Sequence, residues 1–543
     1  MDSRGFVEKT RVLGPLATLV LANSLLLAPV WVLSGRPGPH LVALEAGVVV
    51  GALMLLPDRR WSRVLARVTA GLLVAVALLG LADTTSRMSL ARPLNLYLDV
   101  RLVSAVGNLL GGTLGTTLAV VLLVGAVLAT VGVTVALTRL LASLPADPGH
   151  RRRRLWAAAL LFTSLIAVPL RWGHPAGVVV GLPAVRLLHE QSVQLVLMLQ
   201  ERERFAAEMA ASPASYPADG LLAGLGGRDV IMAFIESYGM SALDDPRYAA
   251  TVRPRLDQMG EELTADGLHM ATGALVAPSQ GGMSWLGHVS MLSGLWLENQ
   301  LRYDLLLAGD RRTLVDDFEA AGYRTVALMP AITLAWPEGE RLGYDRIYAR
   351  EDIDYAGPAL NWVTMPDQFT WSFLEHTVRR DDDTRPLFAE VALISSHAPW
   401  TPILPVLDWD SIGDGAVFEP WREAGERPDE LWRDTERVRE HYALAIGYAV
   451  DAIASYATRY LNDRAVLIVL GDHQAAPLIT GDTDNRTVPV HVVVAEPELL
   501  EPFLAWGFLE GPFPDASAVA PRMDAFRDWF VTEFSTAPAV AER

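Results

Sequence analysis

The sequence predicts two parts: a helical membrane region of about five spans, and an α/β domain with a largely parallel central sheet. Long uncharged runs separated by polar breaks occur within residues 1–172. Beyond residue 227, apolar runs of strand length alternate with segments of helical periodicity. The mean hydropathy of +0.25 is high for a chain with 20% charged residues, because the apolar excess is concentrated in the first part.

Five apolar runs are candidate transmembrane helices, since a bilayer core needs about 20 apolar residues per helix. They cover residues 12–35, 41–57, 68–82, 102–138 and 155–170. Buried core helices are the alternative, and the arrangement of the runs in series with polar breaks argues against it. A cleavable signal peptide does not fit either, because the first run is long and further runs follow it.

Basic residues set the expected orientation. They cluster before the first run, between runs two and three, and between runs four and five, at positions 4, 9 and 11, 59, 60, 63 and 67, and 151–154. With five spans these clusters share one side of the membrane, which the positive-inside rule makes cytoplasmic. We therefore expect a multi-pass protein of the plasma (inner) membrane, with a cytoplasmic N-terminus and an extracytoplasmic domain after residue 171.

The domain division follows from these features. Residues 1–172 form the membrane anchor, 173–227 a linker helix with a boundary segment, and 228–543 the outer domain. Leu, Val and Met recur at helical spacing over 186–211, whereas 212–227 is rich in Pro, Ala and Gly.

The outer domain alternates strands with helices. Strands are expected at 229–235, 325–329, 388–395, 465–470 and 488–495. Helices are expected at 248–265, 312–321, 366–378 and 431–460. Near-continuous apolar strands separated by helices are typical of a parallel sheet that is buried on both faces.

Chemically capable side chains follow three of the expected strands. Glu236 follows the first strand, His397 the third, and Asp472 with His473 the fourth. Active sites of such folds lie beyond the carboxyl ends of strands, where loops and helix N-termini converge. We therefore expect these four residues to form one site.

Glu236, Ser284, Asp472 and His473 are a plausible ligand set for one divalent metal ion. A mixed oxygen and nitrogen set suits zinc or manganese, and the carboxylates also allow magnesium. Gly471 lets the backbone turn so that the two residues after it face inward. Taken alone, Glu236 is equally well an acid that caps the next helix.

Ser284 follows Gly281-Gly282-Met283 and precedes a helical stretch. A metal-bound hydroxyl there has a lowered pKa, so Ser284 is the candidate nucleophile. Serine is also a favoured helix N-cap, which is the structural alternative and is compatible with the first role. Ser290 and Ser293 are weaker candidates, because they lie within or at the end of the helix.

Three histidines are candidates for contacts with substrate. His397 is the natural general acid or phosphate-oxygen donor. His288 lies one helical turn after Ser284, so that its side chain can reach the same mouth. His491 lies within an expected strand and belongs either to the core or to the site.

Composition excludes several classes of function. The chain has no cysteine, which excludes disulfides, thiolate ligands and a cysteine nucleophile. Its formal net charge is −18, which leaves no basic stripe to neutralise phosphates, so a nucleic-acid partner is not expected.

At these residues the chain resembles the sulfatase-like branch of the alkaline phosphatase superfamily. Within that branch it resembles the membrane-anchored lipoteichoic acid synthases and phosphoethanolamine transferases, over about residues 227–535. The resemblance implies an alkaline-phosphatase-like catalytic domain over 228–543. It also implies that Glu236, Ser284, Asp472 and His473 bind the catalytic metal and that His397 contacts the substrate phosphate.

A further segment extends the resemblance. Residues 361–367, Asn-Trp-Val-Thr-Met-Pro-Asp, are similar to the Trp-Gly-x-x-Asp segment of that group, with Val363 in place of the glycine. That segment lines the substrate site, so the resemblance implies substrate contacts for Trp362 and Asp367.

The register around the serine is similar to that of sulfatases. Ser293 and Gly294 stand nine and ten positions after Ser284, as a Thr-Gly pair does after the sulfatase nucleophile. Leu286 and His288 occupy the positions of the Pro and Arg that formylglycine formation needs. The departure favours phosphoryl chemistry over sulfate-ester chemistry.

The sequence thus predicts a membrane-anchored, metal-dependent phosphotransferase or phosphodiesterase that acts on a phospholipid headgroup or an envelope glycan. Membrane lipids are its expected partners. One alternative is a sulfatase or phosphomonoesterase of the same fold, which predicts turnover of simple sulfates or monoesters. The other is a non-catalytic envelope-binding protein, which predicts no metal at Glu236, Asp472 and His473.

Overall fold

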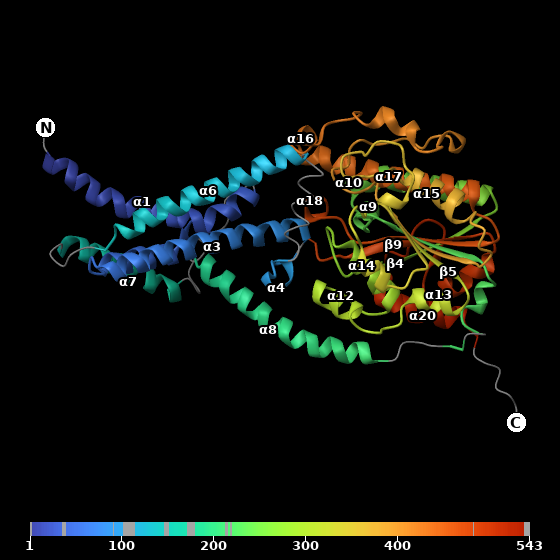
Figure 1. Cartoon of the computed structure of the whole chain (residues 1–543), viewed down its shortest axis with the longest axis horizontal. Helices are drawn as coiled ribbons and strands as arrows, with labels where there is room; N and C mark the ends of the chain where they lie inside the picture. Colours follow the sequence, from blue (N-terminus) through green and yellow to red (C-terminus); the bar gives the residue numbers. More distant parts are fainter. Residues whose placement is uncertain are drawn as a thin grey trace, which may run out of the picture. The chain divides into compact units, whose positions relative to one another are not determined.

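Figure 1 shows the computed structural model, which describes residues 3–34, 40–90, 92–100, 115–145, 151–170, 180–211, 216–217, 220–481 and 483–536. The chain divides into two compact units, Met1–Met88 with Arg92–Leu199 and Ser89–Ala91 with Gln200–Arg543. Parts of the predicted spans 12–35 and 102–138, and of the predicted boundary segment 173–227, lie outside the described residues.

The first unit is helical. Its helices are α1 (Ser3–Ser34), α2 (Leu44–Leu55), α3 (Arg60–Leu90), α4 (Leu96–Asp99), α6 (Thr116–Ala142), α7 (Arg151–Leu170) and the start of α8 (Pro183–Ala210). Two short strands, β1 (Val42–Ala43) and β2 (Val180–Gly181), pair in parallel.

Within the described residues, α3 and α6 are long and apolar enough to cross a membrane. The expectation of about five spans is therefore corrected to two candidate spans. α2 has 12 residues, about 18 Å at 1.5 Å per residue, which is short for a bilayer core of about 30 Å. The described apolar part of α1 covers only Gly14–Ala28, and four of the 20 residues of α7 are arginines. Apolar runs in the sequence overstate the number of transmembrane spans, because a span also needs a helix that is long enough to cross the bilayer core.

The second unit contains an eight-stranded sheet with the strand order β10-β4-β9-β8-β3-β7-β5-β6. The strands are β3 (Asp229–Ile235), β4 (His269–Val276), β5 (Arg324–Met329), β6 (Arg346–Ala349), β7 (Leu387–Leu393), β8 (Ala465–Gly471), β9 (Thr487–Val494) and β10 (Leu509–Glu510). The five predicted strands correspond to β3, β5, β7, β8 and β9.

The sheet is mixed, which corrects the prediction of a largely parallel one. β8, β3, β7, β5 and β6 run in parallel, but β9 is antiparallel to β8, β4 to β9, and β10 to β4. Nearly all of β9 is buried, as a central parallel strand would be. A continuous apolar run indicates that a strand is buried on both faces, but it does not indicate whether the strand is parallel or antiparallel to its neighbours.

Helices cover the sheet on both faces (Figure 1). Along β3, Ile231, Ala233 and Ile235 belong to one hydrophobic cluster, together with residues of α10 and α17. Val230, Met232 and Phe234 belong to a second cluster, with residues of α13 and α20. This alternation is the two-residue period of a strand buried on both sides.

The helices of this unit are α9 (Ser241–Asp244), α10 (Pro246–Ala265), α11 (Ser284–Ser293), α12 (Gln300–Leu307), α13 (Leu314–Ala320), α14 (Pro337–Arg341), α15 (Asp367–Phe373), α16 (Pro428–Leu431), α17 (Thr435–Tyr460), α18 (Pro477–Thr480), α19 (Glu501–Ala505) and α20 (Phe526–Phe534). A π-helical turn, Leu374–Val378, continues α15.

The parallel register brings three strand ends together. Ile235, the last residue of β3, pairs with Leu393 at the end of β7 and with Gly471 at the end of β8. The residues that follow these strands therefore lie at one edge of the sheet, as expected for the functional edge of such a fold.

Candidate active site

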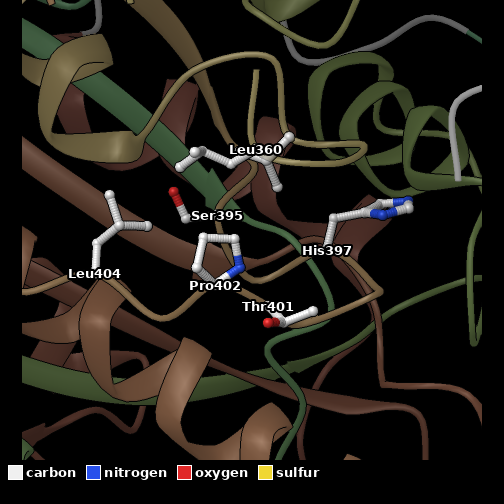
Figure 2. Close-up of a pocket in the computed structure, with 7 residues that line it drawn as sticks. Leu360, Ser395, His397, Thr401, Pro402 and Leu404 are labelled. Atoms are coloured by element: carbon white, nitrogen blue, oxygen red, sulfur yellow. The ribbon is translucent and has the colours of Figure 1, made fainter. Parts of the chain in front are cut away.

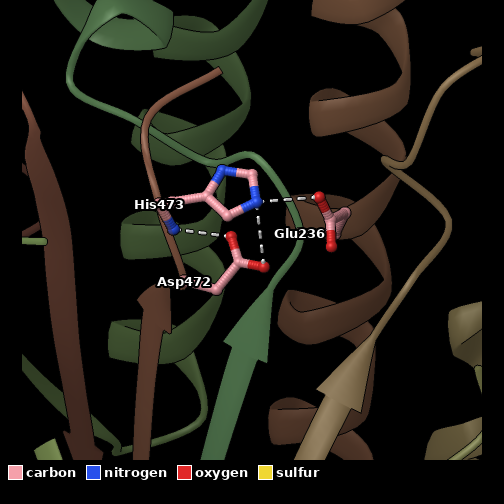
Figure 3. A group of neighbouring side chains, drawn as sticks. All are labelled: Glu236, Asp472 and His473. Atoms are coloured by element: carbon pink, nitrogen blue, oxygen red, sulfur yellow. Dashed lines mark hydrogen bonds and ion pairs between the residues drawn. The ribbon is translucent and has the colours of Figure 1, made fainter. Parts of the chain in front are cut away.

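Glu236, Asp472 and His473 converge at this edge (Figure 3). One ligand atom from each lies within 4.8 Å of the others. His473 Nε2 is 3.2 Å from Glu236 Oε1 and 3.7 Å from Asp472 Oδ2. Asp472 and His473 are buried, and Glu236 is partly exposed at the mouth. The structure thus brings together three of the four predicted metal ligands.

The backbone holds these side chains in place. Two N–H groups, of Ser237 and His473, donate to Asp472 Oδ1 over 2.8 and 2.6 Å, so Oδ2 is the oxygen that faces the cluster. A Cβ at Gly471 would lie 1.8 Å from the carbonyl oxygen of Tyr238, so only glycine allows these strand ends to approach. The predicted role of Gly471 in the turn is thus a close approach of two chain segments.

The donor set fits a divalent cation. His473 Nδ1 lies 3.0 Å from the carbonyl oxygen of Gln474, which requires the hydrogen on Nδ1 and leaves the lone pair on Nε2. That Nε2 is buried and has no hydrogen-bond partner among the described residues. A lone pair that faces two carboxylates is unfavourable without a positive charge between them. A proton or a metal ion can supply that charge.

Burial and mutual charge shift the pKa of each group. Burial alone would lower the pKa of His473, but the charges of Asp472 and Glu236 outweigh it and raise the pKa to about 9. Burial and the charge of Glu236 raise the pKa of Asp472 to about 7. Burial opposes ionisation of Glu236, yet the charges of His473 and His397 hold the pKa of that carboxyl well below its usual range. Without a metal, the site therefore holds a proton on His473 at neutral pH.

Metal affinity is expected to rise with pH up to about 9, because His473 must lose its proton before it binds a cation. Each pH unit below that value lowers the apparent affinity about tenfold, and more steeply below about 7, where Asp472 is also protonated. Calorimetric titrations with zinc in buffers of different ionisation enthalpy measure the protons released. An affinity that does not change between pH 6 and 9 would contradict this arrangement.

Ser284 opens α11 and joins the same cluster. Its Oγ donates to Glu236 Oε2 over 3.0 Å. The N-cap position is Met283, so the structural alternative of a serine cap does not apply. Gly281 and Gly282 both have positive φ, of 72° and 143°, and make the turn that directs Ser284 towards Glu236.

His397 lies beyond β7, beside a pocket (Figure 2). Its Nδ1 is 2.6 Å from the carbonyl oxygen of Ala398, which leaves Nε2 for another partner. Its ring stacks on that of Trp362, with 3.6 Å between centroids and 13° between planes. The pocket is lined by Leu360, Val363, Ser395, His397, Thr401, Pro402 and Leu404. Trp362 therefore orients His397, and its predicted contact with substrate stays a prediction.

Asp367 and His491 have hydrogen-bond partners other than Glu236, Asp472 and His473. Asp367 is fully buried and accepts from the N–H groups of Ile394 and Ser395, each over 2.8 Å. Burial raises its pKa to about 6. Both ring nitrogens of His491 have protein partners, Tyr238 Oη at 3.1 Å and Thr272 Oγ1 at 2.9 Å. Asp367 thus supports the chain that leads to His397, and His491 has no ring nitrogen left for a substrate.

His288 has a partner that was not predicted from the sequence. Its Nδ1 is 2.7 Å from Oε1 of Glu390, which is 1% exposed and lies in the middle of β7. A glutamate within the apolar run Leu-Phe-Ala-Glu-Val-Ala-Leu is the signal that could have found it, because buried glutamates are rarely unpaired.

Strained backbone also gathers at the site. Five non-glycine residues in the described chain have positive φ, and four of them lie at the loops just described: Ser237, Met283, Asn361 and Trp400. Such conformations cost free energy and persist where the surrounding structure enforces them, which is common at active sites.

Comparisons with known proteins give structural matches only, because no family model and no curated protein matches the sequence. The lipoteichoic acid synthase LtaP from Listeria monocytogenes is 14% identical, with 59% of this chain and 73% of that chain covered and a TM-score of 0.33. A protein in the alkaline phosphatase superfamily from Vibrio parahaemolyticus is 15% identical, with 52% and 61% covered and a TM-score of 0.31.

The C-terminal periplasmic domain of EcEptC from Escherichia coli, in complex with Zn, is 15% identical, with 54% and 78% covered and a TM-score of 0.34. The groups that the sequence resembles thus recur among the similar structures. Since the identities and TM-scores are low, the proposal that follows rests on the residues of the site itself.

Proposed function

We propose that the second unit is a metal-dependent phosphotransferase or phosphodiesterase with Ser284 as its nucleophile. One observation carries the proposal: Ser284 Oγ lies 3.0 Å from Glu236, which forms a cluster with the buried Asp472 and His473. Glu236, Ser284, Asp472 and His473 would hold one divalent ion, zinc, manganese or magnesium. When bound, this ion would lower the pKa of the serine hydroxyl and stabilise developing negative charge.

The side chains divide the reaction between them. Ser284, whose hydroxyl would lose its proton to water once its pKa is lowered, attacks phosphorus in line through Oγ and gives a phosphoseryl-type intermediate as the bond to the leaving oxygen breaks. His397, through Nε2, donates a proton to that leaving oxygen. Water or an acceptor hydroxyl then attacks the same phosphorus and releases Ser284. Hydrolysis and transfer differ only in whether water or an acceptor hydroxyl attacks the intermediate.

The first unit is proposed to anchor the chain in the plasma membrane, with α3 and α6 as spans. Arg60 and Arg63 lie at the start of α3, and Arg139 lies near the end of α6, which puts these helix ends on the cytoplasmic side. With α3 and α6 as the candidate spans among the described residues, the extracytoplasmic position of the second unit stays a prediction from the sequence. A phospholipid headgroup or an envelope glycan is the substrate class that such an anchor favours.

The proposed function is tested with the purified full chain on nitrophenyl esters, in the presence of zinc, manganese or magnesium. Turnover of a phosphodiester is expected, followed by assays with phosphatidylglycerol and phosphatidylethanolamine. Preferred turnover of a nitrophenyl sulfate or a nitrophenyl phosphomonoester would instead favour a sulfatase or phosphomonoesterase of the same fold. No turnover and no bound metal would favour the non-catalytic envelope-binding protein.

A further inference from the structure

Glu390 is a buried carboxylate that the proposed reaction does not use. It lies on β7 between Met232 of β3 and Ala327 of β5, so that apolar strands flank it on both sides. Both of its oxygens are engaged: Oε1 lies 2.7 Å from His288 Nδ1, and Oε2 accepts from the hydroxyl of Tyr344. Since a carboxylate in this interior is costly without partners, these two contacts explain how it is accommodated.

His288 is placed next to the reacting groups. It lies one turn after Ser284 on α11, and its ring stacks on Phe234 with 3.8 Å between centroids and 16° between planes. Phe234 precedes Glu236 by two residues on β3. A Cβ at Gly287 would lie 2.4 Å from the carbonyl oxygen of Asp472, so this turn of α11 packs directly against the metal-ligand segment.

The pairing fixes the tautomer of His288. A carboxylate accepts hydrogen bonds and does not donate them, so the hydrogen of the neutral ring lies on Nδ1. Nε2 is then the nitrogen available to another partner. Stacking on Phe234 fixes the plane of the ring, and the contact of Tyr344 with Oε2 fixes the carboxylate that holds it.

The geometry points to Glu390 as a positioning residue for catalysis: it holds His288 so that Nε2 faces the phosphoryl group transferred to Ser284. This inference rests on the proposed function. Glu390 does not touch the substrate, and His288 provides the contact. A glutamate that merely ties α11 to the sheet would have the same two hydrogen bonds, so the test separates catalysis from stability.

The test is a double-mutant cycle on the full chain, with Glu390→Met, His288→Ala and the double variant. Methionine matches the length of glutamate and removes both acceptors. Partners of this kind change activity by about 10- to 100-fold, so Glu390→Met is expected to lower kcat by that factor. The double variant is expected to equal His288→Ala alone, because Glu390 acts through His288.

Glu375→Met is the matched control. Glu375 is also a buried carboxylate, which accepts from Arg379 over 2.7 Å and takes part in no contact of the proposed site. This variant is expected to lower Tm and to leave kcat of the folded enzyme unchanged. A lower Tm with unchanged kcat for Glu390→Met as well would overturn the inference, as would effects of Glu390→Met and His288→Ala that multiply in the double variant.

The same double-mutant cycle can be measured without turnover. The affinity of each zinc-loaded variant for inorganic phosphate is then determined by calorimetry. Each single variant is expected to weaken phosphate binding, and the double variant no further. If the wild-type chain binds phosphate but turns over no ester, the proposed function is wrong. The phosphate-binding cycle then still tests whether Glu390 positions His288. Additive losses in an active wild-type enzyme would sink the inference alone.

Discussion

Replacing Ser284 by alanine is expected to abolish turnover, with kcat lowered at least about 10³-fold, as for the loss of other serine nucleophiles. The variant loses the oxygen that forms the new bond to phosphorus, and among the described residues the only other hydroxyl that donates to the carboxylate of Glu236 is that of Ser237. Metal binding is expected to persist, since Glu236, Asp472 and His473 remain. Steady-state kinetics on the best ester, together with metal analysis of the same preparation, measure both quantities.

Ser293→Ala is the matched control for this variant. Ser293 ends the same helix, and its hydroxyl accepts from the N–H of Leu295, outside the cluster. It is expected to keep kcat within a few-fold of the wild type. Full activity of Ser284→Ala on the true substrate would end the nucleophile assignment.

Replacing Asp472 by alanine is expected to remove both metal binding and the stabilisation that the metal provides. The wild-type site concentrates two carboxylates around His473, so a bound divalent ion is expected to stabilise the folded state. At a metal concentration 100 times Kd this stabilisation amounts to about 2.7 kcal/mol. Thermal unfolding with and without zinc should therefore show a Tm increase of several degrees in the wild type and none in the variant.

Asp381→Ala provides the control, because Asp381 is an exposed carboxylate in a loop. It is expected to respond to zinc as the wild type does. An Asp472→Ala variant that gains the same Tm on addition of zinc would show that the metal binds elsewhere.

The strands that carry the site could be predicted from the sequence, because β3 and β8 are apolar runs followed directly by Glu236 and Asp472, and β7 is an apolar run interrupted only by Glu390. β3 was predicted with its observed bounds, and β7 and β8 to within two residues. Parallel pairing of these three strands then brings Glu236 beside Asp472, as the position of strand ends predicts.

Other parts of the sheet could not be predicted. β4, with the sequence His-Met-Ala-Thr-Gly-Ala-Leu-Val, contains a glycine that weakens the strand signal. In the structure this Gly273 makes room for Phe508, whose ring would lie 2.5 Å from a Cβ at that position. The reason for the glycine is a tertiary contact more than two hundred residues away, which no local pattern contains.

For the candidate site, the sequence did not determine which way each side chain points. His397 and His491 both occur at or near strands, and periodicity alone does not separate them. The structure does so through their partners, since His491 is enclosed by Tyr238 and Thr272 whereas His397 has one ring nitrogen available. Asp367 accepts from the N–H groups after β7, and the substrate contact that the sequence resemblance implies for it stays a prediction.

The central claim is that Ser284 becomes covalently attached to phosphorus during turnover. Mass spectrometry of peptides from the full chain, quenched in acid while it turns over a slow phosphodiester with its metal, tests this claim most directly. The account predicts a phosphoryl adduct on the peptide that contains Ser284, and its absence in Ser284→Ala. Turnover with the adduct on another residue, or with no adduct under conditions that trap the intermediate of a known phosphoserine enzyme, would contradict it.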